Sequence, residues 1–251
     1  MTLRLRTLGA ACVLLDIEGT TTPIAFVNDV LFPFARASVR QFLTDHAKSH
    51  EVRAAIEGLH SEWTDDVSRG NGPPPWPHAA VSSCDVGVVA CYVEWLMDQD
   101  RKSTALKSLQ GQIWQTGYRT GVLHGEVFGD VPAAFARWRR EGIALAIYSS
   151  GSVLAQRLLF QTTTFGDLTP SISAFFDTAI GAKTSPDSYR RIASELNEAT
   201  PRILFVSDTA RELDAARAAG CLVALCARLG NPAQPIQASL PVVHSFEDIA
   251  V

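Results

Sequence analysis

The sequence lacks the basic surplus, the internal repeats and the low-complexity tracts on which several classes of protein depend. Its 22 Lys and Arg residues are outnumbered by 26 Asp and Glu residues, which gives a formal net charge of -4. Such a chain has no basic field to hold a polyanion such as DNA, although a few placed donors suffice for a small anion. With 47% hydrophobic and 19% charged residues, the composition is that of a folded globular protein.

The spacings of disulfide frameworks and zinc sites are also missing. The five cysteines are an odd number without a CxxC pair, so we expect buried free thiols in a reducing compartment. None of the six histidines occurs in an HExxH or CxxC context, and we expect each to have a structural or surface role. The cysteines are Cys12, Cys84, Cys91, Cys221 and Cys226, and the histidines are His46, His50, His60, His78, His124 and His244.

Long hydrophobic runs are few. Residues 8–15 follow two arginines, as in a secretory signal, but the run ends at Asp16 without a small-residue cleavage site, so a strand is predicted. Residues 86–97 are too few to cross a bilayer and include Glu94, which predicts a buried helix of a soluble protein. We therefore expect a cytoplasmic chain.

Helical patterns follow the first predicted strand. Apolar residues recur at close to helical spacing over residues 28–47, 51–66, 83–98 and 103–119. The segment GNGPPPWPH, residues 70–78, is a proline-rich loop that cannot continue a helix. Residues 25–123 are therefore predicted to form an all-helical block.

From residue 131 onward, helical and strand patterns alternate. The expected strands are IALAIYSS, FFDTAIG, ILFVSD and LVALC, and the expected helices are VPAAFARWRREG, SVLAQRLLF, SYRRIASEL and ELDAARAAG. This alternation predicts a parallel sheet with helices on both faces and right-handed crossovers. The 251 residues would then form a doubly wound α/β core from residues 1–24 and 124–251, with residues 25–123 inserted after the first strand as a helical cap.

Polar side chains follow four of the predicted strands. In order along the chain they are Asp16 with Glu18, Ser149 with Ser150, Lys183, and Asp208. Taken singly, each has an ordinary explanation, such as a helix cap or a surface lysine. Because ligands bind at the carboxyl ends of parallel strands, their joint placement at one edge indicates a functional site.

The order of these groups resembles that of the haloacid dehalogenase superfamily of aspartate-dependent phosphatases. Within it, the chain is similar to the enolase-phosphatase family of methionine salvage in the segments DIEGTTTPIAFVNDVLFPFA, DRKSTALKSLQGQIW, YSSGSVLAQRLLF and SDTAREL. The resemblance implies a bifunctional enzyme that enolises 2,3-diketo-5-methylthiopentyl 1-phosphate and then dephosphorylates it through an aspartyl phosphate. The products would be the acireductone 1,2-dihydroxy-3-keto-5-methylthiopentene and phosphate. The resemblance also points to a monomer, as does the absence of a heptad seam.

The chemistry of phosphate monoester hydrolysis suggests a role for each acidic residue. A carboxylate nucleophile that forms an aspartyl phosphate divides one difficult displacement into two easier ones, and we expect Asp16 to fill this role. One Mg²⁺ per subunit would neutralise the clustered acids and the phosphate together, with Asp16 and Asp208 as natural ligands. The resemblance adds Glu18 as a metal ligand, through its carboxylate or its backbone carbonyl.

The remaining groups are expected to bind the phosphate. Lys183 would offset negative charge as it develops on the transferring phosphoryl group. Ser149 and Ser150, with the amides that open the helix from Ser152, would form an anion cradle. Glu212, one helical turn beyond Asp208, is expected to hold the metal shell or Lys183 in place.

Two motifs depart from the wider superfamily. Glu18 stands where an aspartate is usual, and we hypothesise that its longer side chain moves the proton alpha to the substrate carbonyl during enolisation. The lysine motif reads KTSP instead of KPxP, but Lys183 is kept and Pro186 suits the first turn of a helix.

The predicted cap and the overall activity leave alternatives open. Three basic residues could either reach the substrate or form a solvated helix face: Arg101, Lys102 and Lys107. Trp114 could either receive the methylthio group or pack in the core. The alternative activity is a phosphatase of another small phosphate ester without enolase activity. The metal-binding acids argue against a dehalogenase, and the complete set of catalytic positions argues against an inactive binding module on the same fold.

Overall fold

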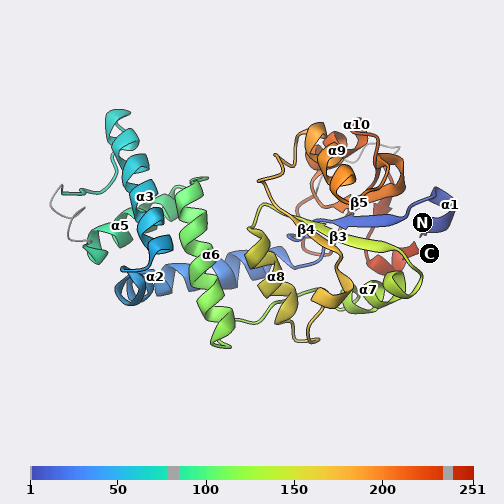
Figure 1. Ribbon diagram of the computed structural model, residues 1–251, viewed down its shortest axis with the longest axis horizontal. Helices are drawn as coiled ribbons and strands as arrows, with labels where there is room; N and C mark the ends of the chain where they lie inside the picture. The colour runs from blue at the N-terminus through green and yellow to red at the C-terminus, as the bar shows by residue number, and fades with distance from the viewer. Residues whose placement is uncertain (1, 78–84, 234–239) are drawn as a thin grey trace. The chain divides into compact units, whose positions relative to one another are not determined.

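The computed structural model describes residues 2–77, 85–233 and 240–251 (Figure 1). The chain divides into two compact units. We call Met1–Val27 with Leu123–Val251 the core unit, and Asn28–Val122 the helical unit. The role of the helical unit as a cap stays a prediction. Cys84 and His78, for which the sequence suggested structural roles, lie outside the described residues.

A six-stranded parallel sheet in the order β4-β3-β2-β5-β6-β7 forms the centre of the core unit. Its strands are β2 (Cys12–Leu15), β3 (Ala144–Tyr148), β4 (Ala174–Phe176), β5 (Ile203–Ser207), β6 (Leu222–Cys226) and β7 (Val242–Val243). All four residues of β2 are apolar and fully buried, as expected for a strand that is covered on both faces. Cys12 of β2 pairs with Ala144 on one side and with Ile203 on the other.

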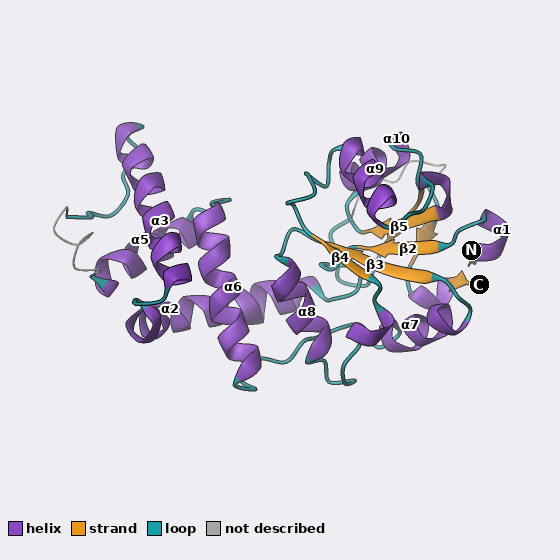
Figure 2. Ribbon diagram, viewed as in Figure 1, coloured by secondary structure: helices purple, strands orange, loops and turns teal. Residues whose placement is uncertain are grey.

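Helices cover both faces of this sheet. They are α7 (Val131–Arg140), α8 (Val153–Gln161), α9 (Pro186–Glu195) and α10 (Ala210–Ala218). Figure 2 shows α7 and α8 on one face and α9 and α10 on the other. Tyr189 of α9 and Leu213 of α10 belong to the same buried cluster as Leu14 of β2. On the opposite face, Phe135 of α7 packs against Phe160 of α8. The predicted doubly wound α/β fold is confirmed.

The start of the chain differs from the prediction. Instead of one strand over residues 8–15, Leu3–Arg4 form β1, Leu5–Leu8 form the single turn α1, and β2 begins only at Cys12. Gly9 ends α1 with a φ of 71°, in the left-handed region that glycine adopts most readily. β1 pairs in parallel with β8 (Ile249–Ala250), so the two ends of the chain lie side by side (Figure 1).

Short 3₁₀ turns complete the core unit, and α-helices make up most of the described part of the helical unit. The turns are η2 (Thr169–Ser171), η3 (Thr200–Arg202) and η4 (Phe246–Asp248). The helices are α2 (Phe32–His46), α3 (His50–Ser68), α5 (Val86–Asp98) and α6 (Thr104–Arg119), with the π-helical η1 (Phe26–Leu31) leading into α2. Side-chain oxygens of Ser49, Asp85 and Ser103 accept backbone N–H bonds that begin α3, α5 and α6.

A buried carboxylate joins three parts of the helical unit. Asp66 is 1% exposed and accepts a hydrogen bond from the Tyr92 hydroxyl at 2.7 Å. Asn71 and Arg101 donate to its other oxygen at 2.7 and 2.9 Å. Burial alone would raise the pKa of Asp66, but these hydrogen bonds outweigh it and hold the pKa below its ordinary value. Arg101, a candidate substrate contact in the sequence, therefore has a structural partner.

The other candidates in the helical unit differ in their surroundings. Lys102 and Lys107 are exposed, as a solvated helix face requires. Trp114 is half-buried, donates its indole N–H to the Leu31 carbonyl at 2.8 Å and packs against the Phe32 ring. The indole of Trp114 is thus held by the first turns of its own unit.

The described cysteines are free, but they are not all buried. Cys12, Cys221 and Cys226 are buried, as expected, whereas Cys91 is exposed. The expectation was wrong for Cys91 because α5 is apolar on nearly every side, and its sequence does not mark which face meets water. Within the described part of the chain, no helix has both the length and the apolar character needed to span a membrane.

Candidate active site

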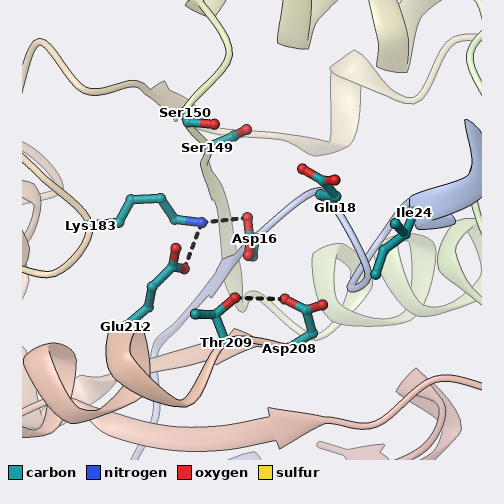
Figure 3. Close-up of a pocket in the computed structure, with 9 residues that line it drawn as sticks. All are labelled: Asp16, Glu18, Ile24, Ser149, Ser150, Lys183, Asp208, Thr209 and Glu212. Atoms are coloured by element: carbon teal, nitrogen blue, oxygen red, sulfur yellow. Dashed lines mark hydrogen bonds and ion pairs between the residues drawn. The ribbon is translucent and has the colours of Figure 1, made fainter. Parts of the chain in front are cut away.

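All the site residues predicted from the sequence line one pocket at the carboxyl edge of the core sheet (Figure 3). Its volume is about 220 Å³, and its lining consists of Asp16, Glu18, Ile24, Ser149, Ser150, Lys183, Asp208, Thr209 and Glu212. Asp16 follows β2, Ser149 follows β3 and Asp208 follows β5, and these three strands are adjacent in the sheet. Since parallel strands end at the same edge, the topology itself brings these residues together.

Asp16 is almost fully buried, with 4% exposure. Its Oδ1 accepts a hydrogen bond from the Ile17 backbone N–H at 2.7 Å and lies 2.6 Å from Lys183 Nζ. Its Oδ2 lies 3.0 Å from the Ser207 hydroxyl. Donors from separate segments thus hold this carboxylate in one orientation, as an attacking group requires.

Lys183 is held at both ends. Its backbone carbonyl accepts a hydrogen bond from the Tyr189 hydroxyl at 2.7 Å, and its ammonium lies 5.9 Å from the centre of the Tyr148 ring. Lys183 Nζ lies 2.6 Å from both Asp16 Oδ1 and Glu212 Oε2. Burial alone would lower the pKa of Lys183, but the two carboxylates outweigh it and raise the pKa above its ordinary value. The ammonium is therefore charged at neutral pH, and Glu212 contacts it.

Ser149 and Ser150 belong to a turn that leads into α8. The Ser152 hydroxyl oxygen caps this helix by accepting the Ala155 N–H at 3.2 Å. Gln156 donates to the carbonyls of Gly151 and Phe176 at 2.7 and 2.8 Å, which ties the turn to the end of β4. The N-terminus of α8 therefore adjoins the pocket, an arrangement suited to an anion.

Acidic groups dominate the opposite side of the pocket. Burial and repulsion from Asp16 raise the pKa of Asp208 to about 6. Desolvation, followed by repulsion from Asp16 and Asp208, raises the pKa of Glu18. Although the surrounding pocket partly desolvates its carboxyl group, Glu18 as a residue is exposed, and Figure 3 shows its carboxylate directed away from Asp208. Both pKa values are raised first by burial and then by the neighbouring acids, so negative charge is concentrated on this side of the pocket.

The pocket's donor set fits a hard divalent cation. Across the described residues, no three His, Cys, Asp or Glu side chains are grouped so that they alone could hold a metal ion. Mg²⁺ does not need three, because it usually keeps several waters and binds one or two carboxylates together with substrate phosphate oxygens. Asp16 and Asp208 offer such carboxylates in a pocket lined by four acids and one lysine.

Several residues around the pocket were not expected from the sequence. Ser207, Thr209 and Ile24 contact or line the site, and Asn231 donates to the carbonyl of Gly19. Ser207 and Thr209 adjoin Asp208, and their place beside this predicted residue is the signal that could have identified them. No local pattern marked Asn231, which lies far along the chain from Gly19.

Comparisons with known proteins agree with this geometry. The model of the haloacid dehalogenase-like hydrolases matches residues 10–220. Enolase-phosphatase E1 of Synechococcus elongatus is 45% identical over 237 residues, which are 94% of this chain and 96% of that protein. A probable bifunctional methylthioribulose-1-phosphate dehydratase/enolase-phosphatase E1 of Vitis vinifera is 44% identical over 95% of this chain, but over only 47% of its own length.

A solved structure extends the likeness to three dimensions. The UTR4 protein of Saccharomyces cerevisiae matches with a TM-score of 0.75 and 30% identity, covering 95% of this chain and 99% of that one. The hydrolase model covers most of the chain, and the relative from Synechococcus elongatus is covered almost completely. The chain therefore belongs to the haloacid dehalogenase-like hydrolases and, within them, to the enolase-phosphatase E1 family.

Proposed function

We propose that this protein is a bifunctional enolase-phosphatase of methionine salvage. It enolises 2,3-diketo-5-methylthiopentyl 1-phosphate and then dephosphorylates it to 1,2-dihydroxy-3-keto-5-methylthiopentene and phosphate. The relative from Vitis vinifera joins a methylthioribulose-1-phosphate dehydratase to its enolase-phosphatase. Loss of water from that ketose phosphate leaves a diketo phosphate, which is the substrate proposed here.

Asp16 is the proposed nucleophile of the phosphatase step. One of its carboxylate oxygens attacks phosphorus, the bond between phosphorus and the substrate oxygen breaks, and that oxygen takes up a proton. Water then attacks the phosphorus of the aspartyl phosphate, which releases phosphate and restores Asp16. The support for this role is the fixed orientation of Asp16 beside the charged Lys183.

Charged and polar groups of the pocket are proposed to bind the phosphoryl group. Lys183 offsets its negative charge, and Ser149 and Ser150 bind its oxygens with the help of the N-terminus of α8. Asp16 and Asp208 would hold one Mg²⁺, with Glu18 as a further ligand through its side chain or its backbone carbonyl. When bound, this ion neutralises the acids and the phosphate together and polarises substrate oxygens.

Glu18 is the proposed base of the enolisation step. Its carboxylate takes the proton from the carbon that carries the phosphate and returns it to the neighbouring carbonyl oxygen, which becomes the enol hydroxyl. The support is its place in the pocket lining and its exposure, which leaves the carboxylate accessible to a substrate carbon.

The helical unit is the proposed cap that excludes water and selects the methylthio tail. The protein is proposed to act as a monomer in the cytoplasm. Free thiols at Cys12, Cys221 and Cys226 are compatible with a reducing compartment.

The observation that carries the proposal is the ion pair between Asp16 and Lys183 in a pocket that also contains Asp208. The test incubates the diketo phosphate with the enzyme and Mg²⁺, with a chelator, and with Asp16→Asn. We expect enediol absorbance and phosphate release from the wild type, and no phosphate release with the chelator or the variant. Release of phosphate from other small esters but not from the diketo phosphate would favour the alternative phosphatase.

Glu18→Gln separates the two half-reactions. We expect enol formation to fall by about 100-fold or more, because the amide cannot accept the substrate proton. Hydrolysis of a chromogenic phosphate ester at saturating Mg²⁺, which needs no enolisation, should fall much less. Enol formation at the wild-type rate, measured by the enediol absorbance, would contradict the role of Glu18.

A further inference from the structure

The segment after β6 returns to the turn that follows β2, and Arg228 anchors it there. Arg228 is 7% exposed, and its Nε and Nη2 donate to the Thr20 carbonyl at 3.1 and 3.0 Å. Its Nη1 forms an ion pair with Asp130 Oδ2 at 2.7 Å. The guanidinium also packs on the rings of Phe128 and Phe246. Because this buried charge has so many partners, it fixes the position of the segment that follows β6.

Asn231 lies three residues beyond Arg228, and its side chain contacts a residue of the pocket. Its backbone N–H donates to the Arg228 carbonyl at 3.1 Å. Its side-chain Nδ2 lies 2.7 Å from the Gly19 carbonyl oxygen and 3.5 Å from Asp208 Oδ2. Both of these oxygens are acceptors, so the amide must present its NH₂ group to them. The bond to Gly19 is short, and the contact with Asp208 is long and weak.

The contact between Gly19, Asp208 and Asn231 is tightly packed and leaves no room for a larger side chain at Gly19. Gly19 has a φ of 69°, and a Cβ at this position would collide with the Asp208 carboxylate and lie 2.9 Å from Asn231 Nδ2. The turn that carries Glu18 and Gly19 therefore packs directly on Asp208. A shift of one of these groups displaces the others.

Asp208 depends on neutral donors for its position. Its Oδ1 accepts a hydrogen bond from the Thr209 hydroxyl at 3.0 Å, and its Oδ2 faces Asn231. Lys183 pairs with Asp16 and Glu212 instead, and no cationic side chain in the described ranges forms an ion pair with Asp208. Repulsion from Asp16 acts on this carboxylate without a balancing ion pair.

We infer that Asn231 is a positioning residue, whose amide holds the Gly19 turn and Asp208 together and so keeps Asp208 in place to share a divalent cation with Asp16. The inference rests on the proposed function, because that function supplies the cation. Asn231 acts through Gly19 and Asp208 and does not itself bind the ion. Loss of such an outer partner typically weakens metal binding by about 10–100-fold.

The test titrates the metal-free protein with Mn²⁺, an oxygen-preferring ion, and measures free Mn²⁺ by electron paramagnetic resonance. For Asn231→Ala we expect the Kd for Mn²⁺ to rise by about 10–100-fold. The melting temperature of the metal-free protein should stay near that of the wild type, and kcat should recover at high Mg²⁺ concentration. Asn231→Ser keeps a shorter donor, so its Kd should lie between those of the wild type and the alanine variant.

Asn71→Ala is the matched control, because Asn71 also donates an amide hydrogen bond to a carboxylate, at 2.7 Å, but within the helical unit. Its Kd for Mn²⁺ should equal that of the wild type. If the wild type itself binds no Mn²⁺, the proposed metal-dependent function fails. If the wild type binds Mn²⁺ and Asn231→Ala binds it equally tightly, or Asn71→Ala weakens binding as much, only the role of Asn231 is overturned.

Discussion

The Ser207 hydroxyl contacts two carboxylates at once. Its Oγ lies 3.0 Å from Asp16 Oδ2 and 3.1 Å from Glu212 Oε2, and the residue is fully buried. A hydroxyl has a single proton to donate, so it satisfies only one of these oxygens unless Glu212 is itself protonated. Burial and repulsion from Asp16 raise the pKa of Glu212 to about 7. The Ser207 hydroxyl therefore helps to orient Asp16 while it also contacts Glu212.

Replacement of Ser207 by Ala should slow the chemical step. Asp16 Oδ2 loses its hydrogen bond, and a bond to a charged group contributes about 1.5–3 kcal/mol, so we expect kcat to fall by about 10–100-fold. KM should change little, because Ser207 is buried and does not line the pocket. Steady-state hydrolysis of a phosphate ester measures both, with Ser194→Ala on the exposed face of α9 as the control. An unchanged kcat would contradict the role of Ser207 in orienting Asp16.

Residues at strand ends were predictable, and residues that reach the site from elsewhere were not. Asp16, Ser149 and Asp208 each end an apolar run, so strand polarity alone places them at one edge. The contact of Asn231 with Gly19 joins residues 212 positions apart and depends on the path of the chain after β6. No periodicity encodes such a contact, because it is a consequence of tertiary packing.

The first turns of α8 position the predicted anion cradle. Gln156 is 2% exposed, and its amide bonds to Gly151 and Phe176 hold the turn against β4. Asp177, just after β4, accepts the Val153 N–H at 3.1 Å and adds a second tie to the same turn. The cradle thus depends on one strand and one helix that the sequence pattern predicted separately.

Gln156→Leu keeps the approximate size of the side chain but removes both amide bonds. We expect the inhibition constant of inorganic phosphate to rise by at least about 5-fold, since two neutral hydrogen bonds that each contribute about 0.5–1.5 kcal/mol hold the turn. Competitive inhibition by phosphate measures the effect. Gln161→Leu, at the exposed end of the same helix, should leave the constant unchanged. Equal constants in wild type and Gln156→Leu would show that the turn is held without Gln156.

Long elements were predicted well, and two-residue strands were not. The alternation after residue 131 predicted β3 to β6 with their helices, because buried strands and amphipathic helices have different periods. The pairing of β1 with β8, and the edge strand β7, were missed because two residues have no period. At the N-terminus, the apolar run of residues 8–15 predicted one strand, although Gly9 ends a helical turn within it.

Each unit of the molecule contains an acid with a lowered pKa, which is buried in one unit and half-buried in the other. In the helical unit this acid is Asp66, and in the core unit it is Asp130, where burial is outweighed by hydrogen bonds from Arg228 and from the Phe246 N–H. A carboxyl group with a lowered pKa stabilises the folded state above its unfolded pKa, which is about 3.9 for Asp. That contribution is lost as the pH falls through the folded value. Acid should therefore weaken both units.

Asp66→Asn removes this charge from the helical unit. At pH 7 we expect a loss of about 2 kcal/mol, because hydrogen bonds to a charged group become neutral ones. The difference between wild type and variant should shrink as the pH falls below about 4, where the wild-type carboxyl group also becomes neutral. Thermal unfolding followed by circular dichroism from pH 7 to pH 3 measures it. A difference that stayed constant across this range would contradict the assigned charge state.

The predicted layout of the whole chain rests on patterns along the sequence and on its charge balance. A helical stretch between one strand and a later strand-helix alternation indicated an insertion, and the charge balance argued against a nucleic-acid partner. Whether the helical unit closes over the pocket has no signature in periodicity, because closure depends on surface complementarity between folded units.

The position of β2 between β3 and β5 separates its synthesis from that of both its partners. β2 is synthesised first, yet its partners in β3 and β5 follow about 130 and 190 residues later, so its pairing has a high contact order and is intrinsically slow. The segment Asn28–Val122 is complete before either partner strand exists. The nascent chain therefore contains all of the helical unit while its buried, apolar strand β2 still lacks both partners, and exposed apolar segments of this kind are what chaperones bind.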